Sequence, residues 1–235
     1  MFKLSRVFLT GAVAAGMSLV AACAPQSEPV RPQVSRPVEP VRVIPPRPYP
    51  PMGAAPNLMI PPRGLDGSRP TVNSGLSGEQ ALWNLRSAYN VAALNCQRSE
   101  HAAILANYSD FLKTHARTLS SVNRSLENQF KSMHGGSYIR VREAFQTKVY
   151  NYFALPPVMP AFCDATLSLS QELRGMSSRD LQALAPISLA RLEAVYQDFF
   201  NRYDQYRVDL SEWEARYGRG GNYQARASFG PAISQ

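Results

Sequence analysis

The chain contains the segment Leu82-Trp-Asn-Leu-Arg-Ser-Ala-Tyr-Asn-Val-Ala-Ala-Leu-Asn-Cys96, whose apolar residues recur at alternating steps of three and four. This spacing places one set of side chains on the same face of a helix: Leu82, Leu85, Tyr89, Ala92 and Cys96. A helix with one apolar face needs other elements to cover that face. We therefore expect the downstream chain to supply further helices.

Helix signals flank this segment on both sides. Ser77 and Gln80 fit a capping box that starts a helix over residues 78–97. The same periodicity predicts further helices over residues 100–134, 138–154, 161–174 and 178–213. The last of them contains Pro186, which predicts a break or restart there. No alternating run long enough for a strand interrupts this order, so we predict an all-α, up-down bundle of four to five helices over residues 72–214.

The N-terminus has the pattern of an export signal. Lys3 and Arg6 precede an apolar run of mostly small residues over positions 7–22, which is the layout of a secretory signal peptide. The run is short for a transmembrane span. It ends in Val20-Ala21-Ala22-Cys23, which resembles the lipobox of bacterial lipoproteins.

This resemblance implies that residues 1–22 are removed and that Cys23 carries acyl chains such as palmitate. Two or more chains hold a protein stably on a membrane. Ala24 follows the cysteine where the lipoprotein class often carries Asp to stay in the inner membrane, so the resemblance favours the periplasmic face of the outer membrane. The other interpretation is an ordinary cleaved signal peptide with an incidental cysteine.

Residues 23–71 are expected to connect the lipidated cysteine to the bundle. They hold fourteen of the nineteen prolines, so we expect a disordered, polyproline-like tether. Its arginines could instead contact anionic polymers or lipid headgroups. Residues 215–235, which contain glycine and arginine, are expected to form a disordered tail.

The net charge of +8 does not indicate a nucleic-acid partner. Between Thr71 and Trp213 there are 14 Lys and Arg against 13 Asp and Glu, so the excess lies in the two ends of the chain. Export also separates the protein from nucleic acid. We therefore expect the partners to be the membrane, through the lipid anchor, and an envelope protein or peptidoglycan.

Cys96 and Cys163 are a candidate disulfide. Cysteines of an exported domain meet an oxidising compartment and usually pair. Cys96 ends the first helix and Cys163 lies near the start of the fourth, and the second helix is longer than the third. The two cysteines therefore meet at one end of the bundle only if the second helix bends, for example near Ser120-Ser121, or if residues 155–160 make up the difference in length between the second and third helices. The alternative is two buried free thiols.

No catalytic, metal or cofactor motif is present in the sequence. His101, His115 and His134 lack metal-ligand spacing, and the three cysteines are too scattered to form a zinc set. The serines form neither a GxSxG nor an SxxK motif. His115 shares a face with apolar residues, which indicates a core histidine.

Two weaker patterns remain. Asn84, Asn90 and Asn95 are poor helix formers inside a helix, which indicates cross-helix hydrogen bonds or a polar groove. Aromatic residues of the last helix cover more than one stripe, so part of the set is a candidate exposed patch for a partner, with Phe200, Tyr203 and Tyr206 as the candidate binding residues.

These observations favour a membrane-anchored envelope lipoprotein whose helical domain is an interaction or scaffolding module rather than an enzyme. The helical region, which begins with Trp83-Asn84-Leu85-Arg86 and has two cysteines, resembles exported helical proteins of Gram-negative bacteria, a resemblance that implies no activity. Alternatives are a helical envelope enzyme acting, for instance, on peptidoglycan, and a small-ligand carrier with an apolar pocket between helices.

Overall fold

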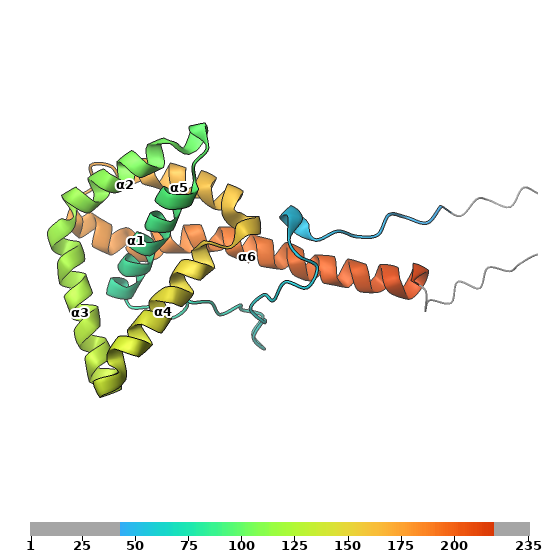
Figure 1. Ribbon diagram of the computed structural model, residues 1–235, viewed down its shortest axis with the longest axis horizontal. Coiled ribbons are helices and arrows are strands. Elements are labelled where there is room, and N and C mark those ends of the chain that lie inside the picture. Colours follow the sequence, from blue (N-terminus) through green and yellow to red (C-terminus); the bar gives the residue numbers. More distant parts are fainter. Residues whose placement is uncertain (1–42, 219–235) are drawn as a thin grey trace, which may run out of the picture. The chain divides into compact units, whose positions relative to one another are not determined.

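The computed structural model describes residues 43–218, and the domain considered below begins at Ile44. Six α-helices form it: α1 (Gly78–Asn95), α2 (Ala103–Thr114), α3 (Ala116–His134), α4 (Tyr138–Phe153), α5 (Met159–Glu172) and α6 (Ser178–Tyr217) (Figure 1). No strand occurs among these described residues. The predicted all-α bundle is confirmed.

Helix α1 lies at the centre and contacts each of the other five helices. Its apolar face is fully buried at Leu82, Leu85 and Ala88. The Ser77 hydroxyl caps the helix by accepting a hydrogen bond from the backbone N–H of Gln80. Burial of this face against every neighbour explains why the periodicity of one helix predicts the class of the whole fold.

The single helix predicted for residues 100–134 is divided in two at His115. The φ and ψ angles of His115 are −103° and 14°, outside the helical range, and α3 leaves α2 in a new direction (Figure 1). The bend therefore lies before Ser120-Ser121. It lets α2 pack on α5 while α3 packs on α4, so each helix covers a different part of the core.

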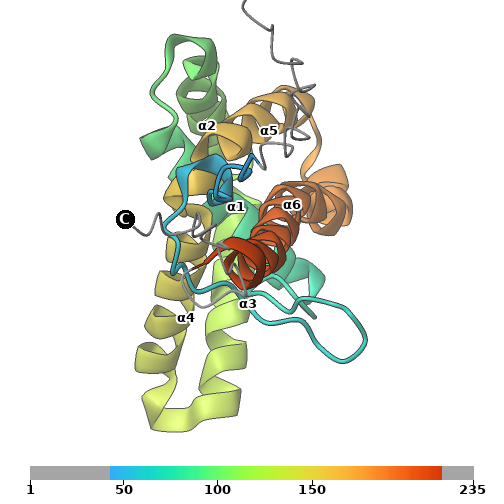
Figure 2. The ribbon, with the colours of Figure 1, turned by 90° about the vertical axis from the view of Figure 1, so that its right-hand side faces the viewer.

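Helices α3 and α4 form a hairpin, seen side by side in Figure 2. The short 3-10 helix Gly135–Ser137 joins them, and Gly135 adopts a φ of +51°, which a glycine tolerates without strain. Near the turn, the rings of Phe130 and Phe145 pack with centroids 6.2 Å apart. Met133 and Ile139 are exposed there.

Helix α6 is continuous through Pro186, so the predicted break does not occur. Pro186 is exposed and lies between the buried residues Ala185 and Leu189. The lost N–H leaves one carbonyl on the solvent side, where water can satisfy it. The helix begins at Ser177, whose hydroxyl accepts a hydrogen bond from the backbone N–H of Asp180.

Cys96 and Cys163 form the predicted disulfide, with their Cα atoms 5.6 Å apart. The bond joins Cys96, the residue that ends α1, to the second turn of α5. Beside it, an aromatic core of Phe153, Phe162 and Tyr196 packs with centroids 5.7 to 5.8 Å apart. The Tyr196 hydroxyl donates a hydrogen bond to the carbonyl of Phe153 at 2.7 Å.

Candidate functional site

Residues 44–71, here called the N-terminal strap, lie against α6 (Figure 1). At the end of the helix, the Trp213 indole donates a hydrogen bond to the carbonyl of Pro45 at 2.8 Å, and Arg47 pairs with Glu214 at 2.6 Å. The expectation of a free tether is therefore wrong from residue 44 onward. The proline-rich composition gave no sign of the surface on α6 to which these residues dock. That surface lies more than a hundred residues away in the sequence.

Tyr203 fixes the middle of the strap. Its buried hydroxyl accepts a hydrogen bond from the backbone N–H of Leu58 at 2.9 Å and donates one to the carbonyl of Ala55 at 2.7 Å. Arg207 donates to the carbonyl of Leu58 at 2.9 Å. Side chains of α6 thus take the place of the backbone partners that this irregular segment lacks.

Arg69 anchors the second half of the strap. Its side chain is only 2% exposed, and it pairs with Asp204 of α6 and donates a hydrogen bond to the carbonyl of Pro61. The guanidinium lies over the ring of Phe200, 5.5 Å from the centroid. Arg63 also reaches Asp204, at 3.2 Å.

The residues predicted to bind a partner are covered by these contacts. Phe200, Tyr203 and Tyr206 are 2%, 0% and 4% exposed. The periodicity correctly predicted a second stripe of aromatic residues on α6. The strap of the same chain covers this stripe. The prediction of an exposed patch at these three residues is wrong.

Glu193 is the polar centre where the strap meets the bundle. Its carboxylate accepts hydrogen bonds from Thr71, Asn73, Tyr152 and Gln197 at 2.8 to 2.9 Å. Burial is the main cause that raises the pKa of Tyr152 far above its ordinary value, and the negative charge of Glu193 is the second. Tyr152 therefore stays a neutral donor to this carboxylate.

Asn84 has the structural role that the sequence suggested. It is fully buried and donates hydrogen bonds to the side chain of Asn73 at 2.9 Å and to the carbonyl of Val72 at 3.3 Å. Its carbonyl accepts from Gln80, so the Gln80 side chain does not return to Ser77 as a full capping box would require. Asn95, in contrast, bonds only within its own helix, to Val91.

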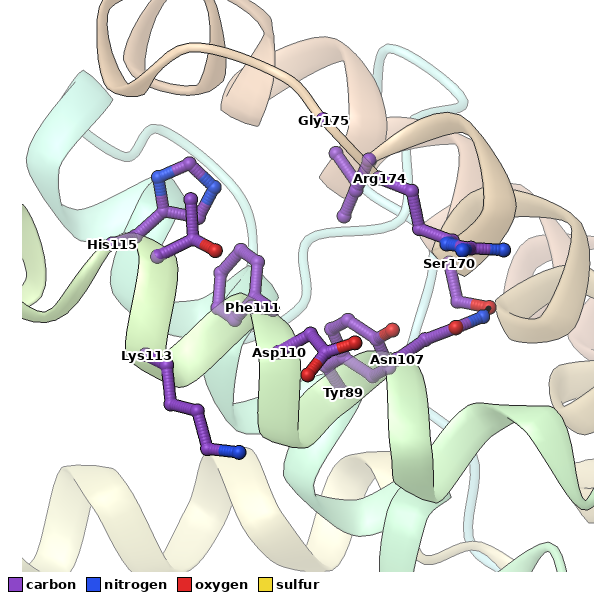
Figure 3. A pocket seen from close by; sticks show the side chains of 11 residues that line it. Tyr89, Asn107, Asp110, Phe111, Lys113, His115, Ser170, Arg174 and Gly175 are labelled. Carbon is purple, nitrogen blue, oxygen red and sulfur yellow. Dashed lines mark hydrogen bonds between the residues drawn. The ribbon is translucent and has the colours of Figure 1, made fainter.

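A pocket of about 360 Å³ lies between α2 and α5 and is the candidate site (Figure 3). Its floor includes Tyr89 of α1 and Phe111 of α2, with ring centroids 5.4 Å apart. Asn107 donates a hydrogen bond across the pocket to the Ser170 hydroxyl at 3.0 Å. The pocket is polar, unlike the apolar pocket expected of a carrier.

The rim of this pocket carries charges of both signs. Asp110 and Lys113 come from α2, and Arg174 comes from the turn that ends α5. Within residues 43–218, none of the three has an ion-pair partner. Lys113 points away from Asp110 and Tyr89 in Figure 3. Asp110 and Arg174 are thus the charges available to a molecule in the pocket.

Tyr89 contributes a buried hydroxyl to the floor. The residue is 2% exposed, and its hydroxyl lies beside the Ser170 hydroxyl. Burial raises the pKa of Tyr89 to about 12, so the hydroxyl is neutral.

His115 lies at one end of the pocket, fully enclosed. Its Nδ1 is 2.9 Å from the Ser178 hydroxyl, and burial lowers the pKa of the imidazole below its ordinary value of 6.5. This serine–histidine contact lacks the carboxylate that would orient the ring in a hydrolase, because Nε2 has no partner in the described chain. The sequence prediction of a core histidine is confirmed.

The lowered pKa of His115 predicts a pH effect on stability. We expect the free energy of unfolding to fall as the pH drops from about 6.5 towards the folded-state pKa, because the unfolded chain binds the proton that the folded chain rejects. The contribution is fully present above about pH 6.5. Urea unfolding at about pH 7.5 and about pH 5.5 measures it, and His115→Gln should show a smaller difference between the two. Equal losses in both proteins would contradict this assignment.

No pattern in the sequence pointed to the pocket residues. Tyr89, Asp110 and Arg174 stand in three helical segments and form no motif. Cys23, residues 1–22 and the tail from residue 219 lie outside the described residues. Between residues 43 and 218, no three His, Cys, Asp or Glu side chains form a group able to hold a metal ion, and no helix is both long and apolar enough to cross a membrane.

Comparison with known proteins gives no further assignment. No protein family, curated protein or solved structure matches this chain.

Proposed function

We propose that this protein is a lipid-anchored component of a bacterial cell envelope whose helical domain is an interaction module. In this proposal Cys23 is acylated and holds the protein on the membrane, on the periplasmic face of the outer membrane. The partner is an envelope protein or peptidoglycan, and nucleic acid is not a partner. The lipobox-like sequence Val20-Ala21-Ala22-Cys23 supports the anchor.

The docked strap is the observation that carries the proposal. Because residues 44–71 are bound to α6, only residues 24–43 remain between Cys23 and the folded domain. At 3.3 to 3.6 Å per residue, these 20 residues reach at most about 70 Å. The connection reaches the domain at the C-terminal end of α6, through Pro45 and Arg47.

This attachment defines which surfaces a partner can use. The strap already covers the aromatic stripe of α6, so a partner would contact the other helices, including the α2–α5 side and the α3–α4 hairpin. The strap and the Cys96–Cys163 disulfide each tie parts of the domain that are far apart in the sequence. A domain tied in this way is suited to hold a binding surface at a limited distance from a membrane.

The two alternative functions receive less support. A hydrolase needs a nucleophile, a base and an orienting carboxylate in one cleft, and the His115–Ser178 contact lacks the last of these within residues 43–218. A carrier of apolar ligands needs an apolar pocket, whereas the pocket between α2 and α5 is lined by charged and hydroxyl groups.

The anchor can be tested with Cys23→Ser. We expect the wild-type protein to incorporate labelled palmitate and to fractionate with membranes, and the variant to do neither, because the acyl chains supply the membrane affinity. In-cell cross-linking should capture envelope partners with the wild type and lose them with the variant. Cys96→Ala–Cys163→Ala is the control for loss of cysteine residues elsewhere in the chain, because it keeps Cys23.

A wild-type protein that takes up no palmitate and is released with the soluble fraction would refute the anchor. Captured partners that persist with Cys23→Ser would instead show that the domain binds them without membrane attachment. The two results separate the anchor from the interaction function.

A further inference from the structure

The pocket between α2 and α5 presents opposite charges from two walls. The Asp110 carboxylate comes from α2 and the Arg174 guanidinium from the end of α5 (Figure 3). They are not paired with each other, nor with any other residue in the described range. A molecule lying between them would meet a negative group on one side and a positive group on the other.

The floor of the pocket is closed by polar groups that lie against one another. Asn107 donates a hydrogen bond to the Ser170 hydroxyl at 3.0 Å, and the buried Tyr89 hydroxyl lies beside Ser170. These groups hold the pocket's shape and leave Asp110 and Arg174 on its rim as the charges that a bound molecule can reach.

The charges select the class of ligand. A simple anion attracted by Arg174 would be opposed by Asp110, and a simple cation would be opposed by Arg174. An apolar molecule would leave the polar lining without partners. A zwitterion satisfies both charges at once, and guanidinium binds a carboxylate through two parallel hydrogen bonds.

We propose that this pocket binds the zwitterionic form of a free amino acid or short peptide, with Arg174 on its carboxylate and Asp110 on its ammonium group. The volume of about 360 Å³ is at the lower end of the range for small-ligand sites, which suits a ligand of one or two residues. The site is independent of the anchor at Cys23. It goes beyond the proposed function.

Calorimetric titration of the full-length protein in detergent micelles tests the site. The probes are L-alanyl-L-alanine and D-alanyl-D-alanine, each added to about 10 mM so that Kd values in the millimolar range are covered. The two enantiomers distinguish ordinary peptides from peptides built of D-amino acids. We expect at least one dipeptide to bind, and its N-acetylated and C-amidated forms to bind at least about tenfold more weakly, because each lacks one charge.

Two variants test the named residues. Arg174→Gln and Asp110→Asn should each weaken binding about tenfold or more. Tyr108→Phe is the control, since Tyr108 packs on the ring of Tyr89, with centroids 4.9 Å apart, but does not line the pocket.

Tyr108→Phe should therefore keep full affinity. The absence of binding by both dipeptides would overturn the proposal. Equal binding of the blocked and free dipeptides would overturn it too, and so would unchanged affinity in Arg174→Gln and Asp110→Asn.

Discussion

Reduction of the Cys96–Cys163 disulfide is expected to lower the free energy of unfolding by about 4 kcal/mol. The bond joins residues 67 positions apart, so it removes a large loop's freedom from the unfolded chain. Single domains are stable by only about 5 to 15 kcal/mol, so this is a large fraction of the total. In the reduced protein, the end of α1 is held to α5 by packing alone.

Urea unfolding of the full chain with and without reductant measures this effect. The Cys96→Ala–Cys163→Ala protein should unfold close to the reduced wild type and should not respond to reductant. An unchanged midpoint on reduction of the wild type would show that the bond contributes little. The comparison with the alanine pair separates the bond from effects of reductant on the rest of the chain.

Replacement of Asp204 by Asn should destabilise the domain by about 3 kcal/mol, the lower end of the range for breaking a buried ion pair from one side. Arg69 would remain buried with its charge opposed only by the Pro61 carbonyl and the face of Phe200. Asp204 itself is one third exposed, which keeps the expected loss near the lower limit. The strap should also detach more often from α6.

Two measurements follow from this expectation. Urea unfolding gives the loss in stability, and limited trypsin digestion should cut the variant faster after Arg63, which Gly64 follows, than the wild type. Asp198→Asn is the control, because Asp198 pairs with Arg202 on the exposed surface at 2.8 Å and such pairs contribute little. Equal digestion rates in wild type and Asp204→Asn would contradict the role assigned to the buried pair.

The contacts of the strap show how part of the proline-rich segment is ordered. Composition predicts an extended segment without a core of its own, and residues 44–71 indeed form only the short 3-10 helix Pro51–Gly53. Contacts with Tyr203, Asp204 and Arg207 of α6 hold these residues in one conformation. A segment that cannot fold alone can still be fixed by side chains of a distant helix.

Local patterns were sufficient for the elements that depend on local physics. Apolar spacing predicts the central helix, Ser77 predicts its start, and a compartment argument predicts the Cys96–Cys163 bond. Each of these rests on interactions within a few residues or on the chemistry of a single residue type. The lipobox at Cys23 is also a local signal, and it remains a prediction.

The bend at His115, the continuity of α6 through Pro186, the docking of the strap and the pocket were decided only in three dimensions. The pocket joins Tyr89, Asp110 and Arg174, and the buried pair joins Arg69 to a residue 135 positions away. Contacts of this range leave no periodic trace in the sequence, because they depend on which helix faces meet. The sequence alone therefore determined the helices and the class of fold, while their packing determined where charges, hydroxyls and the strap come together.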